Sequence, residues 1–217
     1  MARHTPYIIT NEADLNAYES TIDLALCGVD LAYEHETRYA QQGAHDPTPT
    51  HYFILEELFK HCPFDKNTHL LDVGCSTGRV LAYYLRAGHP GQATGVELDP
   101  ELAAIAQAWT ARYPNLHVLQ GNALDLDLSA YTIFYLFNPF SPGMLQRFIE
   151  SIELQVSGTC TVIHTSDNGD TWHYVGRPGW TEVASGAIEH FRNARGYRVK
   201  VFDHPQHYTV WRYDGSA

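Results

Sequence analysis

The most constraining stretch of the sequence runs from Leu70 to Val80, with the order Leu-Leu-Asp-Val-Gly-Cys-Ser-Thr-Gly-Arg-Val. An apolar run ends beside an acid, two glycines bracket a turn of small residues, and apolar residues then recur at three-and-four spacing. This order predicts a strand, a glycine turn and a helix. Glycine lets backbone N–H groups approach a ligand, and a helix N-terminus adds the positive end of its dipole. The stretch therefore predicts a loop for a nucleotide-like cofactor.

Strand and helix patterns alternate from residue 66 onward, which is typical of a parallel sheet covered by helices on both faces. Beyond residue 165 the pattern weakens, and residues 166–193 are expected to form a lid or an irregular insertion. The last two apolar stretches, 197–202 and 207–211, predict two strands at hairpin distance. The other strands are expected at 69–73, 93–98, 116–120, 132–137 and 159–164, and helices at 79–87, 100–112 and 142–154.

The first 65 residues predict a helical cap that precedes an α/β domain at 66–217. Apolar residues at helical spacing between Asp14 and Tyr39, interrupted at Gly28, predict two short helices. Residues 42–49 are rich in glycine and proline and predict a loop. Thr50 is expected to cap a helix that ends near Cys62.

Composition limits the function further. The chain has 217 residues, which suits one domain, and its net charge of -11 argues against binding to nucleic acid or to an anionic membrane. Four widely spaced cysteines suggest neither a disulfide framework nor a zinc site. Without an apolar signal segment or a membrane span, we expect a cytoplasmic protein. His204 and His207 are the closest histidine pair, but no further ligand completes a site, so no metal is expected.

Three interpretations of the glycine loop compete. A dinucleotide G-x-G-x-x-G motif needs glycine at positions occupied by Ser76 and Arg79, so that match fails twice. A G-x-S-x-G nucleophile elbow fits residues 74–78 and makes Ser76 a candidate hydrolase nucleophile. Such an enzyme also needs an upstream glycine-rich oxyanion loop, which is missing, and a downstream acid and histidine. Asp203 and His204 could take those roles, but adjacent residues on one turn rarely point at one another.

The third interpretation is D-x-G-x-G-x-G, in which Asp72, Gly74 and Gly78 match and Ser76 replaces the middle glycine. At this point the chain resembles the class I S-adenosylmethionine-dependent methyltransferases over residues 50–165. The resemblance implies a Rossmann-like three-layer sandwich with a mostly parallel seven-stranded sheet and a C-terminal antiparallel hairpin. Glu97 stands where the family has an acid at the end of the second strand, and a carboxylate there accepts both ribose hydroxyls.

The same resemblance implies S-adenosyl-L-methionine as cofactor, S-adenosyl-L-homocysteine as product, and a set of binding residues. Asp72 would hold the ammonium group and the loop amides the carboxylate of the methionine part. Asn122 stands where the family often has an acid that bonds the adenine amine, although a turn role is equally open. The residues assigned to the cofactor are Asp72, Gly74, Cys75, Ser76, Thr77, Gly78, Glu97, Leu98, Asn122, Ala123 and Asn138.

The acceptor side is expected at Leu136-Phe137-Asn138-Pro139-Phe140, which is similar to the N-P-P-[FY] motif of methyltransferases acting on planar amines. An F-N-P-F string also occurs in a group of bacterial class I methyltransferases. In the amine enzymes the Asn carbonyl accepts from the nucleophilic N–H, which makes Asn138 the catalytic candidate, and a turn role for it stays open. Residues expected near the acceptor or covering the cofactor are Thr48 to Thr50, Tyr52, Pro139, Phe140, His164, Trp172, Tyr174 and Trp180.

We therefore expect a methyltransferase acting on an unidentified acceptor, with the acidic charge favouring a small molecule. A sulfonium methyl group is already activated, so positioning and desolvation of the acceptor supply most of the acceleration. Two alternatives stay open: a non-catalytic S-adenosylmethionine-binding protein, because Ser76 and Asn122 depart from the family pattern, and the α/β hydrolase that would use Ser76. The sequence indicates no oligomeric state.

Overall fold

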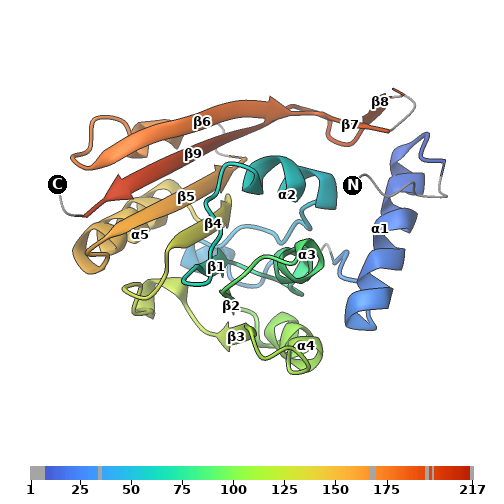
Figure 1. Cartoon of the computed structure of the whole chain (residues 1–217), viewed down its shortest axis with the longest axis horizontal. Coiled ribbons are helices and arrows are strands. Elements are labelled where there is room, and N and C mark those ends of the chain that lie inside the picture. The colour runs from blue at the N-terminus through green and yellow to red at the C-terminus, as the bar shows by residue number, and fades with distance from the viewer. Residues whose placement is uncertain (1–7, 34–35, 167–169, 194–195, 197, 216–217) are drawn as a thin grey trace.

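Parallel strands form the centre of one twisted sheet, and helices cover both of its faces (Figure 1). The computed structural model describes residues 8–33, 36–166, 170–193, 196 and 198–215. In this part of the chain the sheet has seven strands in the order β3-β2-β1-β4-β5-β9-β6. Its strands are β1 His69–Val73, β2 Gln92–Glu97, β3 Leu116–Gln120, β4 Ile133–Phe137, β5 Thr159–Thr165, β6 Trp180–Ile188 and β9 Gln206–Asp214.

The strand order reverses at β1, because β2 and β3 lie on one side of it and β4 and β5 on the other. The five strands from β3 to β5 run parallel, whereas β9 is antiparallel to both β5 and β6. Open α/β sheets bind ligands at the carboxyl ends of the strands on either side of such a reversal. The expected Rossmann-like fold, with a mostly parallel sheet and antiparallel C-terminal strands, is confirmed.

Two apolar cores lie on the two faces of the sheet. Helices α2, α3 and the end of α4 pack with Tyr135 and Ile163 on one face, and α5 packs with Phe134 and Val162 on the other. The fully buried strands carry near-continuous apolar runs, as strands covered on both faces do. The helices are α1 Glu12–Cys27, α2 Tyr52–Phe59, α3 Arg79–Ala87, α4 Pro100–Thr110 and α5 Pro142–Gln155, with short 3-10 turns η1 Ala40–Gln42, η2 Ala123–Asp125 and η3 Asp170–His173.

The N-terminal segment differs from expectation in two places. Among the described residues between 14 and 39 only one α-helix, α1, forms, and Gly28 ends it with a left-handed cap at φ 77°. Thr50 does not cap α2. Its hydroxyl pairs with the Tyr135 hydroxyl at 3.0 Å, and His51 takes the N-cap position without a side-chain bond. The boundary proposed at residue 65 stays a prediction, although α2 belongs to the main core.

The C-terminal region also differs from expectation. The stretch predicted to be irregular contains β6, a nine-residue edge strand paired with β9. The predicted hairpin between 197–202 and 207–211 is wrong, because β8 (Arg198–Lys200) pairs with β7 (His190–Arg192) in a separate two-stranded sheet. Residue 197 and part of the predicted lid, 167–169, lie outside the described residues. Among the described helices, none combines the length and apolar character that a bilayer span requires.

Candidate active site

The glycine loop between β1 and α3 folds back onto the neighbouring strand β2. The N–H groups of Gly74 and Cys75 both donate to the Val96 carbonyl, at 2.9 and 3.0 Å. Gly74 has φ 76° and Ser76 has φ 49°, so the loop turns through left-handed backbone. The N–H of Ser76 donates to Oε2 of Glu97 at 2.7 Å, and that of Gly78 to the Cys75 carbonyl. The loop is therefore held by its own amides.

This finding corrects one expectation. The loop amides were expected to hold a ligand carboxylate, but four of the five between residues 74 and 78 already bond within the protein. Gly78 does not line the cavity described below. A Cβ at Gly78 would lie 2.9 Å from the Trp109 ring, whose indole N–H donates to the Thr77 carbonyl at 2.9 Å. The glycine at position 78 thus serves the packing of α3 against α4.

Glu97 ends β2 with both carboxylate oxygens engaged. Oε1 accepts from the N–H of Asp99 at 2.9 Å and Oε2 from that of Ser76. The residue is 9% exposed. Burial raises the pKa of Glu97, and the backbone donors only partly offset this effect. Because a carboxylate oxygen has two lone pairs, each can still accept one hydroxyl from a ligand.

The carboxyl group of Asp72 has one oxygen without a hydrogen-bond partner among the described residues. The residue is 2% exposed, and this oxygen, Oδ2, is buried. Burial raises the pKa of Asp72 well above its usual range, and the nearby Glu97 carboxylate raises it further. A buried acceptor without a partner is costly, so it indicates a group that the ligand-free protein lacks. A cationic donor would satisfy it.

One cavity joins these groups at the carboxyl edge of the sheet. It reaches from the ends of β1 and β2 across Asn122 to the end of β4. Most of the residues predicted for the cofactor and acceptor line this cavity together. They are Asp72, Gly74, Cys75, Ser76, Thr77, Glu97, Leu98, Asn122, Ala123, Asn138, Pro139 and Phe140.

Tyr52, His164 and Trp172 do not line the cavity. The Tyr52 hydroxyl donates to Asp23 at 2.6 Å below the surface. His164 is buried beside Tyr174, and burial together with His173 lowers the pKa of His164 to about 3, so it is no general base. Trp172 is 61% exposed and stacks on the ring of His173.

Tyr174 and Trp180 lie elsewhere too. They pack with Trp211 and Tyr213 in the core beneath α5. The aromatic residues of this C-terminal region therefore serve packing and do not wall the acceptor site.

The two asparagines at the cavity differ in the hydrogen bonds that their side chains make. The side-chain carbonyl of Asn122 already accepts from the N–H of Leu124 at 3.0 Å, which caps the turn η2. Its amide nitrogen is the group left for a ligand. Asn138 has φ 40°, a left-handed conformation that costs energy in a residue other than glycine. Its side chain has no hydrogen-bond partner among the described residues, and its backbone carbonyl is taken by His45 at 2.7 Å.

Residues 31–50, which we call the strap, form another side of the cavity. The strap contributes Leu31, Thr37, Tyr39, Gln42 and Ala44 to Thr50. Only its last residues, Thr48 to Thr50, were expected to cover the cofactor. The glycine and proline content of 42–49 indicated a loop, but it carried no sign that residues 37–46 approach the end of β4.

The strap is fastened on both sides of the cavity. The Thr77 hydroxyl donates to the Leu31 carbonyl at 2.9 Å, and Arg38 pairs with Asp99 at 3.0 Å. At the other end, Ala44 bridges to Phe140 in antiparallel fashion. The strap therefore contacts the residues that follow β1, β2 and β4, which are the strands that open into the cavity.

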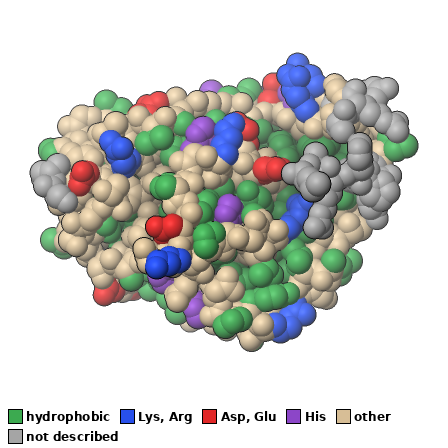
Figure 2. All heavy atoms as spheres, viewed as in Figure 1, with side chains coloured by type: hydrophobic (Ala, Val, Ile, Leu, Met, Phe, Trp, Pro, Cys, Tyr) green, Lys and Arg blue, Asp and Glu red, His purple; other side chains and the backbone are tan. Residues whose placement is uncertain are grey.

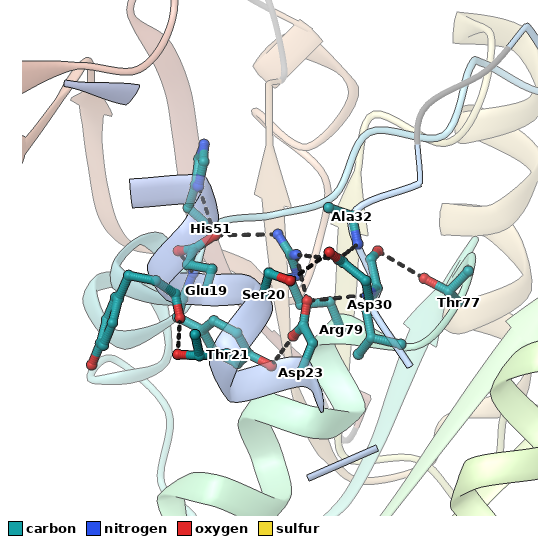
Figure 3. A network of polar contacts seen from close by, with 12 residues as sticks. Glu19, Ser20, Thr21, Asp23, Asp30, Ala32, His51, Thr77 and Arg79 are labelled. Carbon is teal, nitrogen blue, oxygen red and sulfur yellow. Dashed lines mark hydrogen bonds and ion pairs between the residues drawn. The ribbon is translucent and has the colours of Figure 1, made fainter. Parts of the chain in front are cut away.

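A buried ionic network ties α1 to the glycine loop (Figure 3). The guanidinium of Arg79, the first residue of α3, donates to Glu19 at 3.2 Å and to Asp23 at 2.6 Å. Glu19 also accepts from the N–H of Tyr52 and lies 2.8 Å from Nδ1 of His51. Burial raises the pKa of Asp23 although Arg79 opposes that shift. Nothing in the sequence indicated this network, because acids at helical spacing are typical of a solvated helix face.

The hydrolase interpretation lacks its machinery. No described histidine bonds the Ser76 hydroxyl, and the Ser76 N–H is used by Glu97. Asp203 and His204 are exposed on the connection between β8 and β9 and do not line the cavity. Ser76 therefore has no base to activate it.

Comparison with known proteins agrees with this geometry. Residues 70–155, from β1 to the end of α5, match the family model described as a methyltransferase domain. No curated protein sequence matches the chain significantly.

Solved structures share the fold. An RNA methyltransferase from Salinibacter ruber, in complex with S-adenosyl-L-homocysteine, is 20% identical, with a TM-score of 0.52 over 77% of this chain and 92% of that one. The N-methyltransferase NodS from Bradyrhizobium japonicum WM9, also in complex with S-adenosyl-L-homocysteine, is 12% identical, with a TM-score of 0.55 over 75% and 85%. At these identities the likeness concerns the fold alone.

Proposed function

We propose that this chain, which carries a class I S-adenosylmethionine-dependent methyltransferase domain with a Rossmann-like fold, binds S-adenosyl-L-methionine in the cavity and transfers its methyl group to a small molecule. The observation that carries the proposal is the unpartnered Oδ2 of buried Asp72, which lines one cavity with the Glu97 carboxylate. The ligand offers an ammonium group for the first and two ribose hydroxyls for the second.

The residues present fit that ligand end to end. Asp72 binds the ammonium group, and Glu97 accepts from the ribose without releasing the loop, because each oxygen keeps a free lone pair. The ligand carboxylate has two donors near the glycine loop: the N–H of Thr77 and Nε of Arg79, which is buried without a hydrogen-bond partner among the described residues. The amide nitrogen of Asn122 faces the adenine ring.

The bound ligand supplies a methyl group that is already activated on a sulfonium. The chain's task is to hold an acceptor in line with the carbon–sulfur bond and to exclude water. The strap, Asn138, Pro139 and Phe140 enclose the part of the cavity that the cofactor contacts leave free. We therefore assign the strap and the end of β4 to the acceptor, and we call this part of the cavity the acceptor side.

Charge supports a small acceptor over a nucleic acid. The net charge is -11, and on the face seen in Figure 2 the described lysines and arginines lie singly among acidic residues and form no basic patch. A polyanion would be repelled by such a surface, whereas a small molecule would not.

The test is isothermal titration of the protein with S-adenosyl-L-methionine and S-adenosyl-L-homocysteine, with NAD as the control ligand. We expect dissociation constants in the micromolar range, about -8 kcal/mol, for the first two and no heat of binding for NAD. If neither adenosyl ligand binds at about 1 mM, the proposal fails. Binding without turnover on any acceptor would instead favour the non-catalytic alternative.

A further inference from the structure

The feature that leads beyond the cofactor is His45, a strap residue that lines the cavity. Its backbone N–H donates to the Pro139 carbonyl at 3.3 Å, and its Nδ1 lies 2.7 Å from the Asn138 carbonyl. The neighbouring bridge between Ala44 and Phe140, and the bond from the Ser141 N–H to the Gly43 carbonyl, hold the strap in register with the chain after β4. The imidazole is thus fixed at the acceptor side.

The contact with Asn138 defines which ring nitrogen is free. A carbonyl oxygen can only accept, so Nδ1 of His45 must carry the proton of that hydrogen bond. In the neutral imidazole the lone pair then belongs to Nε2. Nε2 has no hydrogen-bond partner among the residues that the structure describes. A base of defined tautomer therefore stands at the acceptor side.

A base at this position favours a hydroxyl acceptor over an amine. The backbone carbonyls of Asn138 and Pro139 each accept one hydrogen bond from His45, which places the imidazole beside the end of β4. A neutral amine keeps its lone pair and needs no base before attack, whereas a hydroxyl must lose its proton to become a good nucleophile. The free lone pair at Nε2 can accept the proton of one acceptor hydroxyl.

We propose that His45 is the general base of the reaction and that the acceptor is a hydroxyl group on a small planar, aromatic molecule. This inference rests on the proposed function. Tyr39, Phe137, Phe140 and Met144 line the acceptor side and favour a flat apolar body. Phenols of that kind are mostly protonated at neutral pH, since their ordinary pKa is about 10.

The transfer balances in charge and atoms. The bond between sulfur and the methyl carbon breaks and sulfur keeps its electron pair, while the acceptor oxygen forms the new bond to the methyl carbon. The hydroxyl proton passes to Nε2 of His45, so the positive charge moves from the sulfonium to the imidazolium. The Asn138 carbonyl stabilises that imidazolium through Nδ1. Because His45 is exposed, the proton then leaves to water.

The first experiment offers the intact protein 2-aminophenol, which carries a hydroxyl and an amine on one ring, with aniline and catechol in parallel. Isotope-labelled methyl groups are located by mass spectrometry and NMR. We expect methylation of catechol and of the oxygen of 2-aminophenol. Methylation of nitrogen, or transfer to none of the hydroxyls while S-adenosyl-L-homocysteine binds, overturns this inference and leaves the proposed cofactor site intact. Absence of S-adenosyl-L-homocysteine binding would overturn the proposed function itself.

The second experiment compares His45→Gln with His204→Gln, a matched change at an exposed histidine outside the cavity. We expect His45→Gln to lower kcat on catechol by about 100 to 10,000-fold and to leave S-adenosyl-L-homocysteine affinity within about twofold. Its rate should then rise tenfold per pH unit toward the pKa of the phenol, about 10, because a phenolate needs no base. An equal loss at every pH would mark a structural role and overturn the assignment.

Other titratable groups share the cavity and remain in both variants, so their effects cancel in that comparison. They are Tyr39, Asp46, Asp72, Cys75, Arg79, Glu97, Asp99 and Tyr135. Nitrogen-15 spectra of His45 in the complex with S-adenosyl-L-homocysteine check the tautomer without turnover. A proton on Nδ1 and none on Nε2 supports the assignment, and the reverse overturns it.

Discussion

Replacing Glu97 with glutamine probes the centre of the proposed cofactor site. The side chain keeps its volume, but the structure shows that both carboxylate oxygens accept backbone N–H groups, from Ser76 and from Asp99. Whichever way the glutamine amide is turned, its NH₂ group must face one of these two donors. Glutamine is therefore a disruptive change here, although it is isosteric.

Two effects follow, and their sizes can be separated. Loss of a charge-assisted bond to a ribose hydroxyl should weaken S-adenosyl-L-methionine binding by about 1.5 to 3 kcal/mol, or roughly 10- to 150-fold. One backbone donor left without a partner should lower the free energy of unfolding of the ligand-free protein by about 1 to 3 kcal/mol. The second effect loosens the glycine loop, so it adds to the first.

Isothermal titration measures the affinity, and urea denaturation without ligand measures the stability. Glu101→Gln is the matched control, because it removes the same charge one turn away, at an exposed side chain paired only with Arg38 among the described residues. We expect the control to stay within about twofold of the wild type in affinity, as surface pairs contribute little. An affinity for Glu97→Gln as close to the wild type as that would refute the placement of the ribose.

Three further changes test the surroundings of the site. Arg79→Met should lower the free energy of unfolding by about 3 to 5 kcal/mol in urea, since buried Asp23 loses its counter-charge, and by less in acid, where Asp23 takes up a proton. The pKa of Asp72 is raised in the folded protein, so the wild type loses stability as the pH rises through that pKa. Asp72→Asn should therefore have a higher free energy of unfolding than the wild type in alkaline buffer and an equal one in acid. Its affinity for S-adenosyl-L-methionine in isothermal titration should be lower. Gly95→Ala should lower thermal stability by about 1 to 3 kcal/mol, because its Cβ would lie 2.5 Å from Sγ of Cys75, and an unchanged melting temperature would contradict this packing.

The parallel half of the fold could be predicted because its signals are local. Strands β1 and β3 begin and end where expected, and α5 differs by one residue. Each is a short apolar run or an amphipathic stretch bounded by glycine, proline or asparagine. The same locality gave the candidate positions Asp72 and Glu97, which the structure brings to one cavity.

Strand β6 could not be predicted in this way. It is an edge strand with mostly exposed side chains and small residues, so it lacks the apolar run of a buried strand. Its Gly186 is needed because a Cβ there would lie 2.9 Å from the Tyr208 ring of the partner strand β9, and that requirement appears only once the strands are paired. Whether such a segment forms a strand depends on its pairing with a distant part of the sequence.

His45 shows the same limit at the site. It lies 93 positions before Asn138 in the sequence, and nothing local in the loop 42–49 relates the two. Conversely, His164 lies one residue before the end of β5, at the edge of the sheet where a catalytic residue is expected, yet it is buried away from the cavity. The position of a residue in the sequence predicts at which edge of the sheet it lies, but it does not predict the direction in which its side chain points.

The two halves of the cavity come from different parts of the chain, and this separates their duties. The ends of β1 and β2 present the carboxylates of Asp72 and Glu97, which suit a cofactor, whereas the strap presents His45 and Tyr39, and the chain at the end of β4 presents Phe137 and Phe140. The strap is bonded to Thr77 in the glycine loop. Asp23 of α1 in turn accepts from both the Arg79 guanidinium and the N–H of Leu31 in the strap, so α1 is bonded to both parts. In the proposed function, α1 would therefore help to hold the cofactor and acceptor sides together, although none of its residues lines the cavity itself.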